Sequence, residues 1–472
     1  MKKQSENIKK RKEKELKKKR KALEKRRLEA KKNDPAFTEK MKQKKAEDKR
    51  IKSEALKEKI GTVTKNIASN KLFLPVAAVL CFAVMCGICY LKDYRIFSAD
   101  FRVNGIFQCL YLGDFSIGLS SRLLIGSILS LFTDIVTANT INIFAKIALY
   151  FSLIMQAVLA AAVIKKGISD KNVFVLLFSV IFIVNPVTVC SYSFYFGTLD
   201  LYNYIVFFVS VIILMKGKSS LQLIVPVLGV IGLLIHYSFF FAFFPALFVL
   251  GLYRTVNSEG KELKKEAASL GVNSVLSVGG FFYLSVFAKH FLRMNAEEMI
   301  EHVKLKSDPE SVYVFEDYLK FYLYDIYKGE QFTDTGASLS ELIRINLGLT
   351  EPSVYIKYLL FISVILIIFW AICGILIKRE KGKHKLPFIA AAVMPFALVP
   401  ELILSSDVWR WVASTVLCQF FVLFAFYLMN VPSVTKLLED IKRIKLPVKI
   451  IGIIVLIIYI GVCFMFEHSL YR

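Results

Sequence analysis

Long uncharged runs alternate with short charged breaks along most of this chain. A helix needs about 20 apolar residues to cross roughly 30 Å of hydrocarbon, and a soluble helix would interrupt such runs with a polar face. The pattern predicts an all-α, polytopic bundle of eleven transmembrane helices, at approximately 72–91, 141–164, 172–190, 197–215, 220–235, 238–253, 269–289, 355–377, 386–404, 412–430 and 448–466.

Charge in the breaks predicts the orientation of the bundle. Lys and Arg collect in every second short break, including 165–171, 254–265 and 378–385, whereas the long segment 290–353 holds six basic and twelve acidic residues. Short basic loops stay in the cytoplasm. We therefore expect a cell-membrane protein with a cytoplasmic N-terminus, an outer C-terminus, and outer loops at 92–140 and 290–353.

Two segments depart from a simple crossing. The pair at 219–253 has only 35 residues, so each arm is about 26 Å long and its outer tip carries His236. Residues 119–136 are too short to span and include Arg122, which predicts an interfacial or re-entrant helix on the outer side.

Composition supports the membrane class and separates a tail from it. Mean hydropathy is +0.53, and 56% of residues are hydrophobic. Of the net charge of +24, +17 belongs to residues 1–71. The first apolar run begins only after this basic segment, which is too late for a signal peptide, and is interpreted as a retained helix. The predicted domains are a basic cytoplasmic tail at 1–70, partly helical or disordered, and a transmembrane domain at 72–466.

The basic composition of the tail predicts a binding partner. Anionic lipid headgroups attract basic segments beside a membrane helix, at about 1 kcal/mol per basic residue. Phe37 is the only aromatic ring in residues 1–60, so nucleic-acid binding, which uses stacked aromatic side chains, is disfavoured. Cys86 and Cys89 have CxxC spacing inside an apolar run, where small apolar filler is the better interpretation, and no metal or disulfide is assigned.

Placing an ionisable residue at membrane depth costs free energy, so such residues usually indicate a functional site. Here they collect at the predicted outer helix ends, accompanied by Tyr and Trp. Carboxylates can act as bases or hold a divalent cation, Arg forks bind phosphate, and flat rings pack on sugars. Aromatic belts and local ion pairs are the structural alternative. The candidates are Asp93, Arg95, Asp114, Arg122, Asp200, His236, Glu401, Asp407, Trp409 and Arg410.

The order of local patterns resembles that of a known group. KDYR after the first helix, then GLSSRLLIG, TDIVTANTINIFAKI, NPVTVCSYSFYFGTLD and LIHYSFFFAFFP follow one another within residues 90–245. The layout is similar to that of GT-C-type glycosyltransferases, and the patterns are similar to those of the membrane glucosyltransferases that modify O-antigen. By position, Asp93 and Arg95 correspond to an acid-Tyr-Arg pattern, Arg122 to a Gly-Arg pattern and Asp200 to a Ser-Tyr…Asp pattern. A single Asp93 stands where those enzymes have paired acids.

The resemblance implies transfer of a sugar from a polyprenyl-phosphate donor at the outer leaflet, in cell-envelope polysaccharide or glycolipid modification. Asp93 or Asp114 would be the base or a ligand of a divalent cation, and Arg95 and Arg122 would bind phosphate. Asp200 and His236 would contact substrate, and Asp407, Trp409 and Arg410 would bracket the acceptor or lipid headgroup. A transporter or flippase for a lipid-linked glycan and an envelope polysaccharide polymerase are the alternatives.

Overall fold

A computed structural model describes residues 69–98, 101–185, 196–217, 219–319, 352–404 and 408–470, and isolated positions before residue 69. The contacts divide the chain into two units, residues 1–70 and residues 71–472, and the helical bundle belongs to the second unit. The predicted character of the tail falls on residues that are almost all outside those described.

The described residues form helices and no strand, with one isolated bridge between Val136 and Ser307. In chain order the helices are α3 (Phe73–Lys92), η1 (Tyr94–Phe97), α4 (Gly105–Gln108), η2 (Cys109–Tyr111), α5 (Leu124–Leu129), α6 (Ala138–Ser169), α7 (Val173–Val184), α10 (Asp200–Lys216), α11 (Ser219–Gln222), α12 (Ile224–Ile235), α13 (Phe239–Ala242), α14 (Phe244–Asn257), α15 (Gly260–Phe282), η3 (Tyr283–Phe287), η4 (Ala288–Phe291), α16 (Ala296–Lys306), α17 (Glu316–Leu319), α21 (Pro352–Arg379), η6 (Gly382–Lys385), α22 (Leu386–Val393), η7 (Met394–Leu398), α23 (Val399–Leu404), α24 (Val408–Leu428), α25 (Pro432–Arg443) and α26 (Leu446–Leu470).

Four of these helices are long and apolar enough to cross a membrane: those at Phe73–Leu91, Ala138–Ser169, Gly260–Ser285 and Arg410–Leu428. The bent pair α25 and α26 makes a fifth if it is one span. The protein is therefore an α-helical membrane protein. A helix lies in each of the eleven predicted ranges, but α7 and α12 have 12 residues each, about 18 Å, which is shorter than the hydrocarbon core. The number of crossings and the orientation stay predictions.

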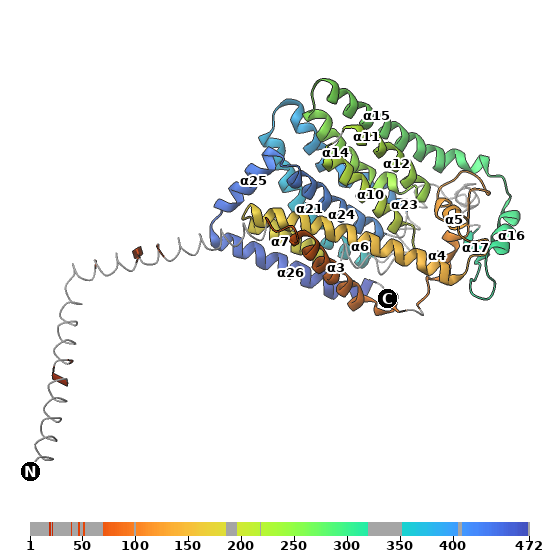
Figure 1. Ribbon diagram of the computed structural model, residues 1–472, viewed down its shortest axis with the longest axis horizontal. Helices are drawn as coiled ribbons and strands as arrows, with labels where there is room; N and C mark the ends of the chain where they lie inside the picture. The colour runs from red at the N-terminus through yellow and green to blue at the C-terminus, as the bar shows by residue number, and fades with distance from the viewer. Residues whose placement is uncertain are drawn as a thin grey trace, which may run out of the picture. The chain divides into compact units, whose positions relative to one another are not determined.

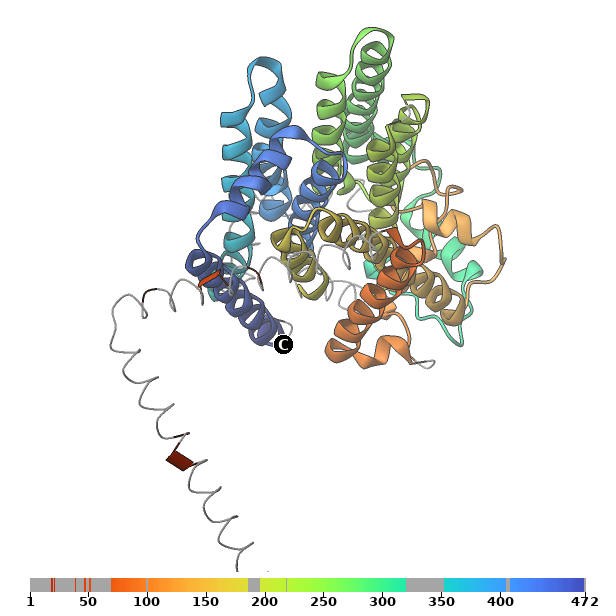
Figure 2. The same ribbon diagram turned by 60° about the vertical axis from the view of Figure 1, so that its left-hand side comes forward.

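Helix α24 lies at the centre of the bundle (Figures 1 and 2). Within its apolar window 89% of residues are buried, against 28% for α3 and 22% for α15. Phe420, Phe421 and Phe424 pack against aromatic rings of α7 and α10, with ring centroids 4.5–5.9 Å apart. Such aromatic packing adds to the energy of burial and fixes the central helix against its neighbours.

The bundle has two distinct ends (Figure 1). Helices α4, α5, α16 and α17 gather at one end, here called the loop end, and α25 lies at the opposite end, here called the α25 end. The described parts of the two predicted outer loops that form α4, α5, α16 and α17 lie at the loop end. Near the α25 end Arg254 of α14 pairs with the buried Glu266 of α15 and donates to two carbonyls at the end of α10.

The predicted interfacial helix at 119–136 is much shorter than expected, because only Leu124–Leu129 is helical. Arg122, just before it, has a φ of 70°, which ends any helix on that side. The hydroxyls of Ser127, within the helix, and of Ser130, at its C-cap, donate to the carbonyls of Leu123 and Gly126 at 2.8 and 2.9 Å. The segment is a compact loop built around one and a half turns of helix.

Candidate functional site

The segment 109–130 carries two of the predicted site residues, Asp114 and Arg122, at the loop end. It is bound to the corner between α12 and α13. The backbone N–H of Arg122 donates to the carbonyl of Leu234 at 2.9 Å, and the Ser121 hydroxyl donates to that of Leu233 at 2.9 Å. The N–H of Tyr237 in turn donates to the Ser121 hydroxyl. Backbone contacts therefore hold this loop against the helical core.

Close packing inside the segment places Asp114. A Cβ on Gly126 would lie 2.0 Å from the carbonyl oxygen of Gly113 and 2.9 Å from that of Tyr111, so only glycine permits this approach. The N–H of Phe115 also donates to the Ser127 hydroxyl at 2.8 Å. Helix α5 thus supports the chain on both sides of Asp114.

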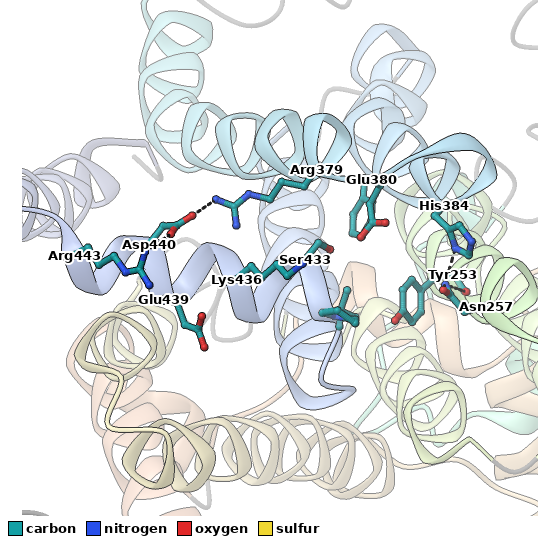
Figure 3. A pocket seen from close by; sticks show the side chains of 13 residues that line it. Tyr253, Asn257, Arg379, Glu380, His384, Ser433, Lys436, Glu439, Asp440 and Arg443 are labelled. Carbon is teal, nitrogen blue, oxygen red and sulfur yellow. Dashed lines mark hydrogen bonds and ion pairs between the residues drawn. The ribbon is translucent and has the colours of Figure 1, made fainter.

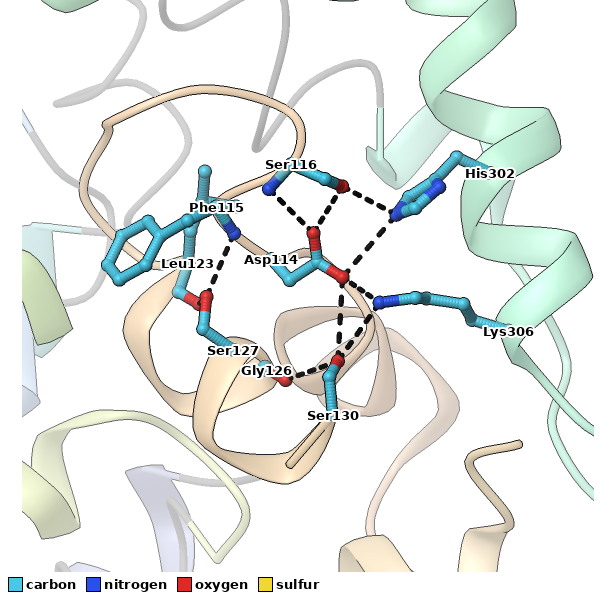
Figure 4. Close-up of polar contacts among 9 residues, drawn as sticks. All are labelled: Asp114, Phe115, Ser116, Leu123, Gly126, Ser127, Ser130, His302 and Lys306. Atoms are coloured by element: carbon cyan, nitrogen blue, oxygen red, sulfur yellow. Dashed lines mark hydrogen bonds and ion pairs between the residues drawn. The ribbon is translucent and has the colours of Figure 1, made fainter. Parts of the chain in front are cut away.

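Asp114 is 5% exposed and both of its carboxylate oxygens are engaged (Figure 4). Oδ1 accepts from the backbone N–H of Ser116 at 2.8 Å and from the Ser116 hydroxyl. Oδ2 pairs with the Lys306 ammonium and lies 3.4 Å from both Ser130 Oγ and His302 Nε2. Two basic side chains from a distant segment therefore complete the surroundings of this buried acid.

Helix α16 supplies both basic side chains. His302 and Lys306 are four residues apart, so they lie on one face of the helix. The helix begins with a capping box between Asn295 and Glu298 and ends where the chain pairs with Val136, whose N–H donates to the Lys306 carbonyl at 2.6 Å. These contacts anchor α16 at both ends and hold its basic face over Asp114.

The geometry around His302 differs from that of a serine-hydrolase triad. Ser116 Oγ, at 2.9 Å, and Asp114 Oδ2 both face the same ring nitrogen, Nε2, whereas a triad places the serine and the acid on opposite nitrogens. Burial lowers the pKa of His302 from its ordinary value of 6.5, so the imidazole is neutral at pH 7. A neutral imidazole leaves Lys306 as the cation beside Asp114.

A second cluster of buried charges lies beside the α12–α13 corner. Arg410, in the first turns of α24, pairs with Asp200 at 2.7 Å, and the Thr198 hydroxyl donates to the same Asp200 oxygen at 3.2 Å. Arg122 donates to the Tyr237 hydroxyl at 3.3 Å, and its guanidinium lies 5.2 Å from the centre of the Tyr237 ring. Two arginines from distant segments are thus held at the same corner.

Glu401 and His236 belong to this second cluster. Glu401, in α23, is 6% exposed, and its Oε1 has no hydrogen-bond partner among the described residues. Glu401 interacts electrostatically with Arg410, Arg122 and Asp200. His236 interacts in the same way with both arginines. His236 Nδ1 accepts from the Ser238 N–H at 3.1 Å, which leaves Nε2 to carry the proton in the neutral ring.

The remaining predicted residues are distributed differently. Asp93 and Arg95 form a two-pronged ion pair with each other at 2.8 and 2.9 Å, and the arginine lowers the pKa of Asp93. Arg410, for which a local ion pair was the structural alternative, pairs with Asp200 of a distant segment. Asp407 lies outside the described residues, as does the side chain of Trp409, whose backbone is in the first turn of α24.

Sequence reasoning missed His302 and Lys306 as site residues. Their four-residue spacing was visible, but a basic pair on an amphipathic helix is normally a solvated face. No group of three or more His, Cys, Asp or Glu that could hold a metal ion occurs among the described residues, and the divalent cation stays a hypothesis.

A polar cavity of about 680 Å³ lies at the α25 end (Figure 3). Several of its charged side chains are already paired: Arg379 lies 2.6 Å from Asp440, and Arg443 lies 4.0 Å from the same residue. His384 Nδ1 lies 3.2 Å from the side-chain oxygen of Asn257. None of the sequence-predicted site residues lines this cavity.

We predict that Gly126→Ala lowers stability, by about 1–3 kcal/mol, because the new methyl group pushes the Gly113 carbonyl away and shifts the chain at Asp114. Thermal unfolding of the detergent-purified protein would measure this as a lower midpoint. Gly271→Ala, in α15 where a Cβ meets nothing within 4 Å, is the control and should not lower it. Equal midpoints for both variants would contradict the close packing.

Comparison with protein-family models, curated proteins and solved structures finds no match to this chain.

Proposed function

We propose that the chain is a membrane glycosyltransferase of GT-C type, which transfers a sugar from a polyprenyl-phosphate donor at the outer leaflet in cell-envelope polysaccharide or glycolipid modification. The single observation that carries the proposal is that one compact segment, 109–130, presents a buried acid on one side and a buried arginine on the other. Acid–base chemistry and phosphate binding are the two requirements of such a transfer.

The second cluster of buried charges, which contains Arg122 and Arg410, is the proposed binding site for the donor phosphate. Arg122 and Arg410 are both largely buried, where a charge-assisted hydrogen bond is stronger than in water. Tyr237 lies beside the guanidinium of Arg122 and Trp411 beside that of Arg410, and the partly exposed Tyr237 ring provides a flat face for a sugar ring. The donor phosphate would compete with Asp200 for Arg410 and would also bind Arg122.

Asp114 is the proposed proton acceptor. In the transfer, an acceptor hydroxyl oxygen bonds to the anomeric carbon, the bond from that carbon to the phosphate oxygen breaks, and polyprenyl phosphate leaves with the electron pair. The hydroxyl proton passes to Asp114. Lys306 neutralises Asp114, and in the proposed mechanism the acceptor hydroxyl displaces the ammonium, which frees the carboxylate to act as a base.

Asp93 is less suited to this role than Asp114. Both of its oxygens accept from Arg95, and its lowered pKa makes it a weaker base. His302 is proposed as a positioning residue. In its neutral form it adds no second positive charge beside Asp114, so the acid keeps its strength as a proton acceptor.

We predict that Asp114→Asn reduces sugar transfer at least about 100-fold, because an amide cannot take the proton. Transfer would be measured with the detergent-purified protein, a panel of radiolabelled polyprenyl-phosphate sugars and membrane lipid extract as acceptor. Glu297→Gln, an exposed acid in the first turn of α16, is the control and should keep full turnover. Asp93→Asn would be assayed alongside and should lose less than Asp114→Asn.

Turnover that survives Asp114→Asn would sink the assignment of the base. No turnover by the wild-type protein with any donor, while lipid-linked glycans still bind, would favour the flippase alternative over a transferase.

We also predict an acid-side loss of activity caused by His302. Its pKa is lowered below 6.5, so the ring becomes charged only as the pH falls below that value, and the new charge then weakens Asp114 as a base. A pH profile of transfer should show a decline that begins below pH 6.5, and His302→Gln should remove it. A decline that persists unchanged in His302→Gln would assign that limb to another group.

A further inference from the structure

An apolar groove of about 380 Å³ lies between helices of the bundle, with α25 on one side of it. Side chains of α7, α21, α24, α25 and α26 line it, among them Phe178, Ile372 and Phe424. The hydroxyl of Tyr427 is the polar group of this otherwise hydrocarbon lining, and it donates to Asp170 at 2.7 Å. An apolar cavity stays dry and takes up apolar molecules, so the groove suits a hydrocarbon.

Helix α25 separates this groove from the polar cavity. Val434, Leu437 and Ile441, spaced three and four residues apart, line the groove, whereas Ser433 and Lys436 line the polar cavity (Figure 3). The axis of α25 is bent by 109° from that of the following apolar helix. A helix with one apolar and one charged face that lies across the ends of membrane helices is typical of the membrane interface.

Lys166, Lys442 and Asp170 lie around Tyr427 at the edge of the groove and carry a formal net charge of +1. The Lys166 ammonium lies 4.2 Å from the centre of the Tyr427 ring and donates to the Tyr427 carbonyl. The Lys442 ammonium donates to the carbonyl of Asp170 at 2.8 Å. Each ammonium has three donors, and these contacts use one donor of each. Both lysines can therefore donate to a further anionic group above Tyr427.

We propose that this groove is a binding site for one chain of an anionic phospholipid, whose phosphate lies against Lys166 and Lys442. An apolar groove whose edge has two lysines and one aspartate, and so a net positive charge, matches a lipid that has an apolar chain and a negative headgroup. Basic residues at a membrane surface favour such lipids. The site lies at the end opposite to the proposed transfer site, and it does not depend on that proposal.

Photolabelling tests the site directly. The purified full-length protein would be reconstituted in phosphatidylcholine vesicles with a trace of phosphatidylglycerol that carries a photoactivatable chain. After illumination, labelled peptides would be mapped. We expect label on α7, α21 and α24, and roughly tenfold less when the probe is phosphatidylcholine with the same chain.

Two pairs of variants separate this site from general lipid contact. Ala371→Trp, which fills the groove, should lose the label, whereas Ile147→Trp, on the exposed face of α6, should keep it. Lys166→Gln with Lys442→Gln should remove the preference for phosphatidylglycerol, and exposed Lys261→Gln with Lys383→Gln should not.

Label that is unchanged by Ala371→Trp would mean that the lipid is not in the groove. Equal labelling of the wild-type protein by the two lipids would overturn the headgroup assignment, and this comparison needs no variant to fold. Elution from size exclusion would establish that each variant is folded.

Discussion

The absence of water in hydrocarbon is the constraint on which this structure depends. Backbone polar groups must pair within helices, and side-chain charges must reach the ends of the bundle or find partners. Helix α24 follows this rule closely: residues 411–428 carry no charge, whereas Arg410 lies at the end and pairs with Asp200. Charged side chains therefore lie at the ends of the bundle, and at the loop end several of them lie close enough together to form a candidate site.

The loop end depends on backbone contacts more than on long helices. Segment 109–130 lies between the α12–α13 corner and α16, and its glycine at 126 permits an approach that any side chain would prevent. Because Asp114 and Arg122 lie on this one segment, a shift in it would alter both the proposed base and the proposed phosphate site. Helix α16 covers the acid with His302 and Lys306, and the Lys306 ammonium neutralises its charge.

The apolar runs predicted where helices lie, since each of the eleven ranges contains one, but they did not predict helix length at α7, α12 or residues 119–136. Helix ends there depend on backbone turns such as that at Arg122. Arg122, Asp200, Glu401 and Arg410, which the sequence analysis grouped by predicted side, lie close together in the structure. The partners of Asp114 could not be predicted, because His302 is 188 residues away and only tertiary packing brings it close.

Binding of radiolabelled polyprenyl phosphate to the purified protein tests the central claim most directly, because it measures recognition of the lipid phosphate without requiring the correct sugar or acceptor. The account predicts that Arg122→Gln weakens binding at least about tenfold, since a buried charge-assisted hydrogen bond is lost, and that Arg443→Gln at the α25 end leaves binding unchanged. Equal affinity of the wild-type protein and Arg122→Gln would contradict it.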